Sequence, residues 1–288
     1  MEKKLTNSIQ NDFLKITGVK ISKIYIKNKI LPVFRYLDES KKNMFLLSGS
    51  QGIGKTTFIK ILYKNFNKYY KKKILTLSLD DFYYSKNYRK KLSKLIHPLM
   101  ATRGVPGTHN IKLLLKIINN FEKNRYPIEI PIFDKLNDNR IKKKRIINYK
   151  HDILILEGWC CGSPPIKNYY LYKNINKLEK EYDKKFVWRN YYNKLLKNDY
   201  SKIFKKFDLL IYFKTHSFSY VKNWRLKQEN QMKKKMSKSK LSMNKKQIIF
   251  FISHYEKLTK WMMKKLHLKA NLTLFIDDKQ KIKKISNV

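Results

Sequence analysis

A glycine-rich pattern near the start of the chain constrains its fold more than any other feature. An apolar run at 44–47 is followed by Gly49, four further residues and then Gly54, Lys55 and Thr56. This is the P-loop pattern: backbone N–H groups surround phosphate oxygens, the lysine reaches the β- and γ-phosphates, and the hydroxyl joins the Mg²⁺ shell. The apolar run is typical of a buried strand, and the helix predicted after the motif adds its positive N-terminal end. The residues expected to bind a nucleoside triphosphate are Gly49, Ser50, Gln51, Gly52, Ile53, Gly54, Lys55, Thr56 and Thr57.

Length and composition limit the remaining possibilities. With 288 residues and 42% hydrophobic content, the chain can bury a substantial core, and we expect one α/β domain over residues 1–288. No apolar run approaches the ~20 residues of a membrane span, so no membrane partner is expected. Cys160 and Cys161 are adjacent, which excludes a disulfide framework and a four-ligand zinc site. These features favour the cytoplasm.

The net charge of +45 would ordinarily indicate a nucleic-acid partner. Here only 8 of the 66 basic residues are Arg, and the Lys residues are spread along the whole chain together with Asn, Ile and Tyr. A nucleic-acid footprint should cluster on one face and use Arg for bidentate contacts. We therefore interpret the charge as AT-rich coding bias on a solvated surface, with no specific nucleic-acid partner.

Glycine is scarce in this chain, so its positions are informative. Seven of the eight Gly residues fall in three short stretches, at 49–54, 104–107 and 158–162. We expect these stretches to converge on one site.

Two predicted strands end on acidic residues. The run 74–79 ends on Asp80 and Asp81, and the run 153–156 ends on Glu157. Open α/β sheets bind ligands at the carboxyl ends of their strands. Asp80 is therefore placed to meet a substrate hydroxyl, and Glu157 fits the Walker B role of supporting Mg²⁺ or its waters. A buried acid without a metal role is the alternative for Glu157.

The segment 97–110 is too rich in Gly and Pro for regular structure and is predicted to be a shaped loop. His97, Arg103 and His109 beside constrained backbone suit an anionic or polar substrate. A turn between helices is the alternative interpretation. A helix is expected over residues 111–121.

Most of the remaining chain is predicted to form helices around a sheet. We expect helices before residue 40, a helical insertion at about 163–205, a helix opening at Trp224 and a helix capped by Asn244. An edge strand or hairpin is expected at 128–135, leading into a solvated Lys-rich loop at 142–145. Further strands are expected at 207–213 and at 272–276, which closes the sheet.

Taken in order, these motifs resemble the glycerate kinase family of plant and fungal type and its bacterial kinase-like relatives. That family lies in the wider P-loop group with uridine kinase, phosphoribulokinase and pantothenate kinase. The resemblance covers the chain from about Phe45 to Ile276. Besides the P-loop it includes Leu79-Asp80-Asp81-Phe82-Tyr83, His97-Pro98, Arg103-Gly104-Val105-Pro106-Gly107-Thr108-His109, Ile130-Pro131-Ile132-Phe133-Asp134-Lys135, Glu157-Gly158-Trp159, Trp224-Arg225-Leu226 with Gln228-Glu229, and Tyr255-Glu256.

The resemblance implies a P-loop NTPase-type three-layer α/β sandwich, with a mostly parallel central sheet, a helical insertion and a lid at about 222–245. It implies phosphoryl transfer from ATP, with Mg²⁺, to a hydroxyl of a small molecule, and glycerate is the family's best-known acceptor. In related kinases the acid of the Asp-x-Phe motif, here Asp80, accepts or orients the substrate proton. A lid arginine, here Arg225, stabilises the transferred charge. The residues expected to bind substrate are Asp81, Tyr83, His97, Arg103, His109 and Asp134.

The chain departs from this family in two places. Phe133 stands where relatives usually have Tyr, and the segment 235–243 lacks the Gly that relatives use near the lid. Two functions of other classes stay open, a nucleic-acid-stimulated ATPase and a non-catalytic ATP-binding regulator. The chain has no Asn-Lys-x-Asp guanine-reading motif, which disfavours a GTPase. The sequence identifies neither the acceptor nor the oligomeric state.

Overall fold

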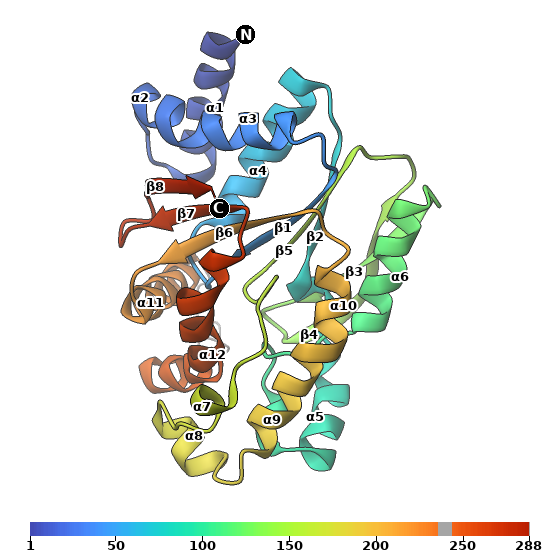
Figure 1. Ribbon diagram of the computed structural model, residues 1–288, viewed down its shortest axis with the longest axis vertical. Helices are drawn as coiled ribbons and strands as arrows, with labels where there is room; N and C mark the ends of the chain where they lie inside the picture. Colours follow the sequence, from blue (N-terminus) through green and yellow to red (C-terminus); the bar gives the residue numbers. More distant parts are fainter. Residues whose placement is uncertain (236–243, 288) are drawn as a thin grey trace.

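The computed structural model describes residues 1–235 and 244–287. Its centre is a six-stranded sheet in the order β2-β5-β1-β6-β7-β8, in which every pair is parallel except β7 with β8 (Figure 1). Helices cover both faces, so the predicted three-layer sandwich is confirmed. The strands of this sheet are β1 Met44–Gly49, β2 Ile74–Ser78, β5 Ile153–Gly158, β6 Leu209–Thr215, β7 Leu272–Ile276 and β8 Ile282–Asn287.

Strand β1 lies in the middle of the sheet, and its residues are buried throughout. Successive side chains of a strand point to opposite faces. Met44 and Leu46 therefore join one core, while Phe45 and Leu47 join the other. A continuous apolar run is what a strand covered on both faces requires.

The helices divide between these two cores. The core that contains Phe45 is covered by α1 Glu2–Thr17, α3 Leu31–Glu39, α4 Lys55–Asn65 and α11 Phe218–Lys235, with the short α2 Lys23–Tyr25 beside them. The core that contains Leu46 is covered by α6 Ile111–Glu122, the insertion helices α7 Asn168–Leu171, α8 Lys177–Tyr182, α9 Val187–Leu195 and α10 Ser201–Phe204, and most of α12 Lys245–Lys265. Helix α5 spans Lys86–Leu95.

Several helix predictions are confirmed, including the helical insertion and the helix after Asn110. Asn244 caps α12 as expected, and the Gln247 side chain bonds back to the Asn244 backbone to complete a capping box. Helix α11 begins at Phe218, so the prediction that it opens at Trp224 was wrong by almost two turns. Part of the predicted lid, residues 236–243, lies outside the described residues. No helix in the described ranges has the length and apolarity needed to span a membrane.

The Lys-rich segment 142–145 was predicted as a loop, and this prediction was wrong. It belongs to β4 Asn139–Ile147, which pairs antiparallel with β3 Ile128–Asp134 in a separate two-stranded sheet. Its lysines are exposed, as expected. The pairing depends on backbone groups, so it tolerates long charged side chains that extend into water.

The sequence pattern predicted that 272–276 is the last strand of the sheet, and this prediction was wrong. A turn follows Ile276, closed by a hydrogen bond from the Lys281 backbone N–H to the Asp277 carboxylate at 2.7 Å. The chain then returns as β8, which pairs antiparallel with β7. This added edge strand positions residues 277–281 beside the P-loop.

Candidate active site

The P-loop connects β1 to α4 at the carboxyl edge of the sheet. Gly52 and Gly54 have φ of 76° and 108°, a region that favours glycine. A Cβ on Gly52 would lie 2.7 Å from Cβ of Trp224, so α11 packs directly against the loop. Lys55 is the first residue of α4 and is buried, and its ammonium donates to the carbonyls of Gly49 at 2.6 Å and Ser50 at 3.1 Å. Burial lowers the pKa of Lys55, while the negative charges of Glu157 and Asp80 oppose that shift.

Glu157 lies one strand from the P-loop, at the end of β5. It is level with Leu47 of β1 and with Ser78 of β2 in the strand register. The Ser78 hydroxyl donates to Oε1 of Glu157 at 2.6 Å, which orients the carboxylate. The sequence analysis missed Ser78, although its place at the end of β2 was a usable signal. Over the described residues, no three or more His, Cys, Asp or Glu side chains gather into a metal-binding group.

Asp80 and Asp81 follow β2 in a single 3₁₀ turn, Leu79–Phe82. Oδ2 of Asp80 accepts from the Lys135 ammonium at 2.6 Å, and Oδ1 accepts from the Tyr83 hydroxyl at 3.0 Å. Asp81 instead accepts from the backbone N–H of Phe133 at 3.3 Å and so attaches the β3–β4 hairpin to the turn. The two carboxylates therefore have different partners.

The pKa values of these two acids move in opposite directions. Burial raises the pKa of Asp80, but the charge and hydrogen bond of Lys135, with contributions from His109 and Tyr83, outweigh it and give a pKa of about 2. Burial raises the pKa of Asp81, and the hydrogen bond from Phe133 only partly offsets that effect. Asp80 is therefore the more firmly ionised carboxylate.

Arg103 lies in the Gly/Pro-rich loop, as predicted, and several groups already bind its guanidinium. It pairs with the Asp138 carboxylate, donates to the Lys135 carbonyl at 3.3 Å, and stacks over the rings of Phe133 and Phe251 with centroids 5.6 and 5.7 Å from Cζ. Desolvation lowers the pKa of Arg103, but the charge of Asp138 and its hydrogen bond outweigh that effect and raise the pKa. These contacts brace the loop against the β3–β4 hairpin.

The three glycine stretches do converge. Gly158 is level with Ser48 in the β1–β5 register, directly before the P-loop. The Trp159 indole N–H donates to the Gly104 carbonyl at 2.9 Å, which connects the second and third stretches. A Cβ on Gly104 would lie 2.1 Å from the Tyr255 hydroxyl oxygen, so this close approach requires glycine.

The two predicted loop histidines lie in different surroundings. His109 is buried, its ring stacks on Tyr83 with centroids 4.4 Å apart, and Nδ1 lies 2.6 Å from the Tyr200 hydroxyl. Burial lowers the pKa of His109 to about 3, so the ring is neutral near pH 7. His97 accepts from the Leu99 backbone N–H and its Nε2 lies 3.9 Å from Asp183 in the helical insertion. His109 therefore adjoins Asp80 through Tyr83, whereas His97 faces the insertion.

Two further predicted residues have mainly local partners. Asp134 accepts hydrogen bonds from the Leu136 and Asn137 backbone and from the Asn137 side chain, and so caps the β3–β4 turn. Arg225 pairs with Glu229 one turn later at 2.9 Å and stacks over Phe251 with the ring centroid 5.5 Å from Cζ. Arg225 and Arg103 thus contact the same ring of α12, which brings α11 toward the loop.

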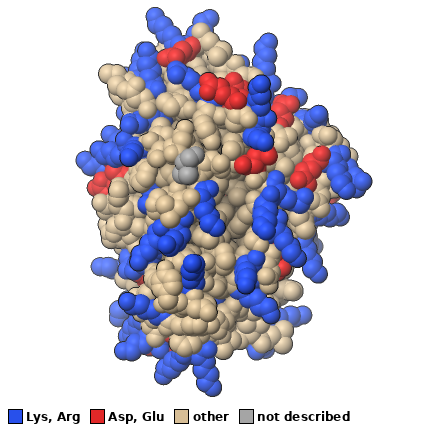
Figure 2. All heavy atoms as spheres, in the orientation of Figure 1, with Lys and Arg blue, Asp and Glu red and all other residues tan. Residues whose placement is uncertain are grey.

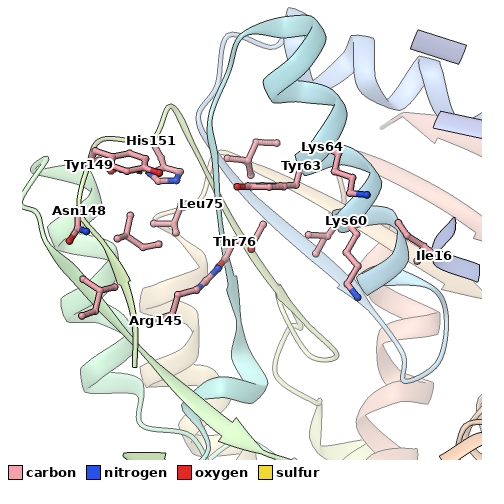
Figure 3. A pocket seen from close by; sticks show the side chains of 14 residues that line it. Ile16, Lys60, Tyr63, Lys64, Leu75, Thr76, Arg145, Asn148, Tyr149 and His151 are labelled. Carbon is pink, nitrogen blue, oxygen red and sulfur yellow. Dashed lines mark hydrogen bonds between the residues drawn. The ribbon is translucent and has the colours of Figure 1, made fainter. Parts of the chain in front are cut away.

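Two cavities lie near α4, and one of them adjoins the P-loop. A cavity of about 200 Å³ lies between α4, the turn before β8 and the N-terminal helices; Gly54, Thr57, Phe58 and 279–281 are among its lining residues. A larger cleft of about 600 Å³ lies between α4, strand β2 and the segment at the end of β4 (Figure 3). Tyr63 and Arg145 are among its lining residues, and the Arg145 side chain points toward Thr76. None of the predicted site residues lines this cleft.

Together these features define a class of protein. A P-loop between β1 and α4, with acidic side chains directly after β2 and at the end of β5 in a mostly parallel sheet, is the arrangement of a P-loop kinase. The chain matches no protein-family model. Individual proteins do match, both in sequence and in structure.

The similar proteins are kinases. The chain is 32% identical over 235 residues to "Probable ATP-dependent kinase TDA10" of Saccharomyces cerevisiae, covering 72% of this chain and 73% of that protein. It is 29% identical over 243 residues to "Uncharacterized kinase mug58" of Schizosaccharomyces pombe, covering 80% and 85%. It is 27% identical over 219 residues to "D-glycerate 3-kinase, chloroplastic" of Arabidopsis thaliana, covering 72% and 45%.

Two solved protein structures also have a similar fold. The structure of the YGR205w protein superposes on this chain with a TM-score of 0.69 at 26% sequence identity. The match covers 91% of this chain and 95% of the YGR205w protein. A D-glycerate 3-kinase from Cryptococcus neoformans gives the same TM-score at 21% identity over 100% and 99% of the two chains, a likeness of fold. The chain belongs to the glycerate kinase family of P-loop kinases.

Proposed function

We propose that this kinase transfers the γ-phosphoryl group of ATP to a hydroxyl of a small-molecule metabolite. One observation carries the proposal: the Asp80 carboxylate follows β2 at the same edge of the sheet as the P-loop and its buried lysine, Lys55. Phosphoryl transfer depends mostly on orientation and charge stabilisation. Lys55 and Arg225 would stabilise the transferred group, and Asp80 would orient the acceptor hydroxyl.

The donor site is proposed as follows. The N–H groups of the P-loop, residues 49–57, would bind the phosphates, and the cavity of about 200 Å³ beside Gly54 and Phe58 has room for part of the base. The exposed Thr56 hydroxyl and the Glu157 carboxylate suit Mg²⁺, which binds proteins through few side chains and keeps phosphate and water ligands. When bound, the ion would neutralise charge on the phosphates.

The acceptor site would lie around Asp80, Tyr83 and His109, beneath the loop that Arg103 braces. A small hydroxy acid such as D-glycerate is the first candidate, because similar proteins carry the name D-glycerate 3-kinase. The test is ADP formation by purified protein with ATP and Mg²⁺ against a panel that contains D-glycerate, pantothenate, uridine and related alcohols. One acceptor should raise turnover well above the acceptor-free rate. ATP binding without turnover for any of them would instead favour the non-catalytic regulator.

Arg103→Lys is expected to lower the melting temperature and to change the KM values for acceptor and ATP by similar factors. The Arg103 guanidinium donates to both the Asp138 carboxylate and the Lys135 carbonyl. A lysine ammonium lacks the planar group that makes both contacts at once. Losing about 1–2 kcal/mol from these contacts corresponds to a few degrees for a chain of this size. Arg35→Lys is the matched control, because Arg35 makes an exposed pair with Glu2.

A different result would assign Arg103 to the substrate. If Arg103→Lys raised the acceptor KM alone, by a factor corresponding to roughly 1.5–3 kcal/mol, with an unchanged melting temperature, the guanidinium would bind an acidic acceptor directly. Thermal melting and both KM values measured on one preparation distinguish the two roles.

The net charge of +45 supports one competing function, a nucleic-acid-stimulated ATPase. On the face seen in Figure 2, Lys and Arg are scattered over most of the surface and do not gather in one patch. We therefore expect weak duplex DNA or RNA binding without sequence preference, lost steeply between ~50 and ~200 mM salt. Nanomolar binding that survives ~200 mM salt, or ATP hydrolysis that rises with added RNA, would favour the competing function.

A further inference from the structure

A second lysine lies in the proposed active site, and the motif analysis assigned it no role. Lys135 follows β3 directly, and its ammonium lies 2.6 Å from Oδ2 of Asp80. The Lys135 side chain is 58% exposed and that of Asp80 is 27% exposed. Both side chains are therefore accessible to solvent, so a small acceptor could reach the pair.

Two backbone hydrogen bonds hold the β3–β4 hairpin in place next to the contact between Lys135 and Asp80. The backbone N–H of Phe133, two residues earlier, bonds to Asp81 of the 3₁₀ turn. The carbonyl of Lys135 itself accepts from Arg103 of the Gly/Pro-rich loop. Three segments thus position the lysine opposite Asp80.

Several groups face Asp80 from the surrounding elements. Tyr83 donates a hydrogen bond to it from the same turn, and His109 lies nearby with a neutral, buried ring. Lys55 of α4 and Tyr255 of α12 act on it electrostatically from further away. Within the described part of the chain, Lys135 is the cation that forms an ion pair with Asp80.

We propose that Lys135 is the positioning residue for Asp80: its ammonium orients the carboxylate so that a remaining lone pair can accept a hydrogen bond from the hydroxyl of the phosphoryl acceptor. The proposal rests on the kinase function proposed above. A carboxylate has about four lone-pair sites, so the bonds from Lys135 and Tyr83 leave room for a substrate hydroxyl. With a pKa of about 2, Asp80 is a weak base and serves mainly to orient the nucleophile.

The pair adds little to the stability of the fold. Ion pairs with a largely exposed partner contribute about 0–1 kcal/mol to folding. A second exposed pair on the same hairpin, Lys144 with Glu129 at 2.5 Å, provides the comparison. Lys135→Ala and Lys144→Ala each remove one ammonium from the hairpin, but only the first removes it from Asp80.

The experiment compares wild type, Lys135→Ala, Lys135→Arg and Lys144→Ala with ATP and the best acceptor from the panel. Lys135→Ala should lower kcat by on the order of 10- to 100-fold with little change in the Kd for ATP. Lys135→Arg should recover part of the loss, and Lys144→Ala should match wild type. The acid limb of the kcat/KM profile should move to higher pH in Lys135→Ala, because burial then raises the pKa of Asp80 without the opposing charge.

The failure of this inference is distinguishable from failure of the proposed function. If wild type phosphorylates an acceptor and Lys135→Ala has wild-type kcat and an unmoved acid limb, Lys135 has no positioning role. If wild type phosphorylates nothing, the kinase proposal fails first. The Asp80 carboxyl can still be titrated by ¹³C NMR in wild type and Lys135→Ala, and an unchanged pKa there would overturn the coupling.

Discussion

Lys55→Ala should lower phosphoryl transfer by about 10²–10³-fold or more and leave the fold intact. The ammonium of Lys55 bonds to two carbonyls of the P-loop itself, those of Gly49 and Ser50, so it serves the phosphate-binding loop. Its burial lowers its pKa and removes competing water from any phosphate contact. Steady-state turnover with ATP, together with thermal melting, is the measurement.

Lys60→Ala is the matched control, because Lys60 lies on the same helix with an exposed side chain. It should retain wild-type turnover. Lys55→Met keeps the length of the apolar stem, so it separates lost charge from lost packing if the alanine variant melts early. A Lys55 variant that turns over at the wild-type rate would rule out this phosphate site.

Asp80→Asn should lower kcat by on the order of a hundredfold with little change in ATP affinity, and Asp81→Asn should do much less. The amide that replaces the carboxylate at position 80 would be neutral, so it would lose the charge attraction to the Lys135 ammonium. An amide oxygen at position 81 can still accept the Phe133 N–H. The different partners of the two acids separate their roles. The reverse order of severity would contradict the assignment.

The pKa shifts predict how the two variants differ in stability. Asp80 has a lowered folded pKa, so its ionised form stabilises the fold above its ordinary pKa of 3.8, and this contribution is lost as the pH falls through about 2. Asp81 has a raised folded pKa, so its ionisation costs stability as the pH rises above 3.8. Near pH 7 we therefore expect Asp81→Asn to melt at or above the wild-type temperature and Asp80→Asn to melt no higher than wild type.

The local sequence determined the part of the protein that we propose binds ATP. A P-loop needs a strand, a tight glycine turn and a helix in immediate succession, so a contiguous pattern was sufficient to predict β1, the loop and α4. Glu157 and Asp80 were predictable for a related reason. An apolar run that ends in an acid marks the carboxyl end of a buried strand, and parallel strands bring those ends to one edge of the sheet.

Only the tertiary structure decided how the proposed acceptor site is held together. Lys135 meets Asp80 across 55 residues, Ser78 meets Glu157 across 79, and Tyr255 meets the carbonyl of Arg103 across 152. The Lys-rich segment 142–145 becomes a strand for the same reason, since its partner strand supplies the hydrogen bonds. Such contacts depend on strand register and on how helices and hairpins pack against the sheet, and no local pattern of side chains encodes that geometry.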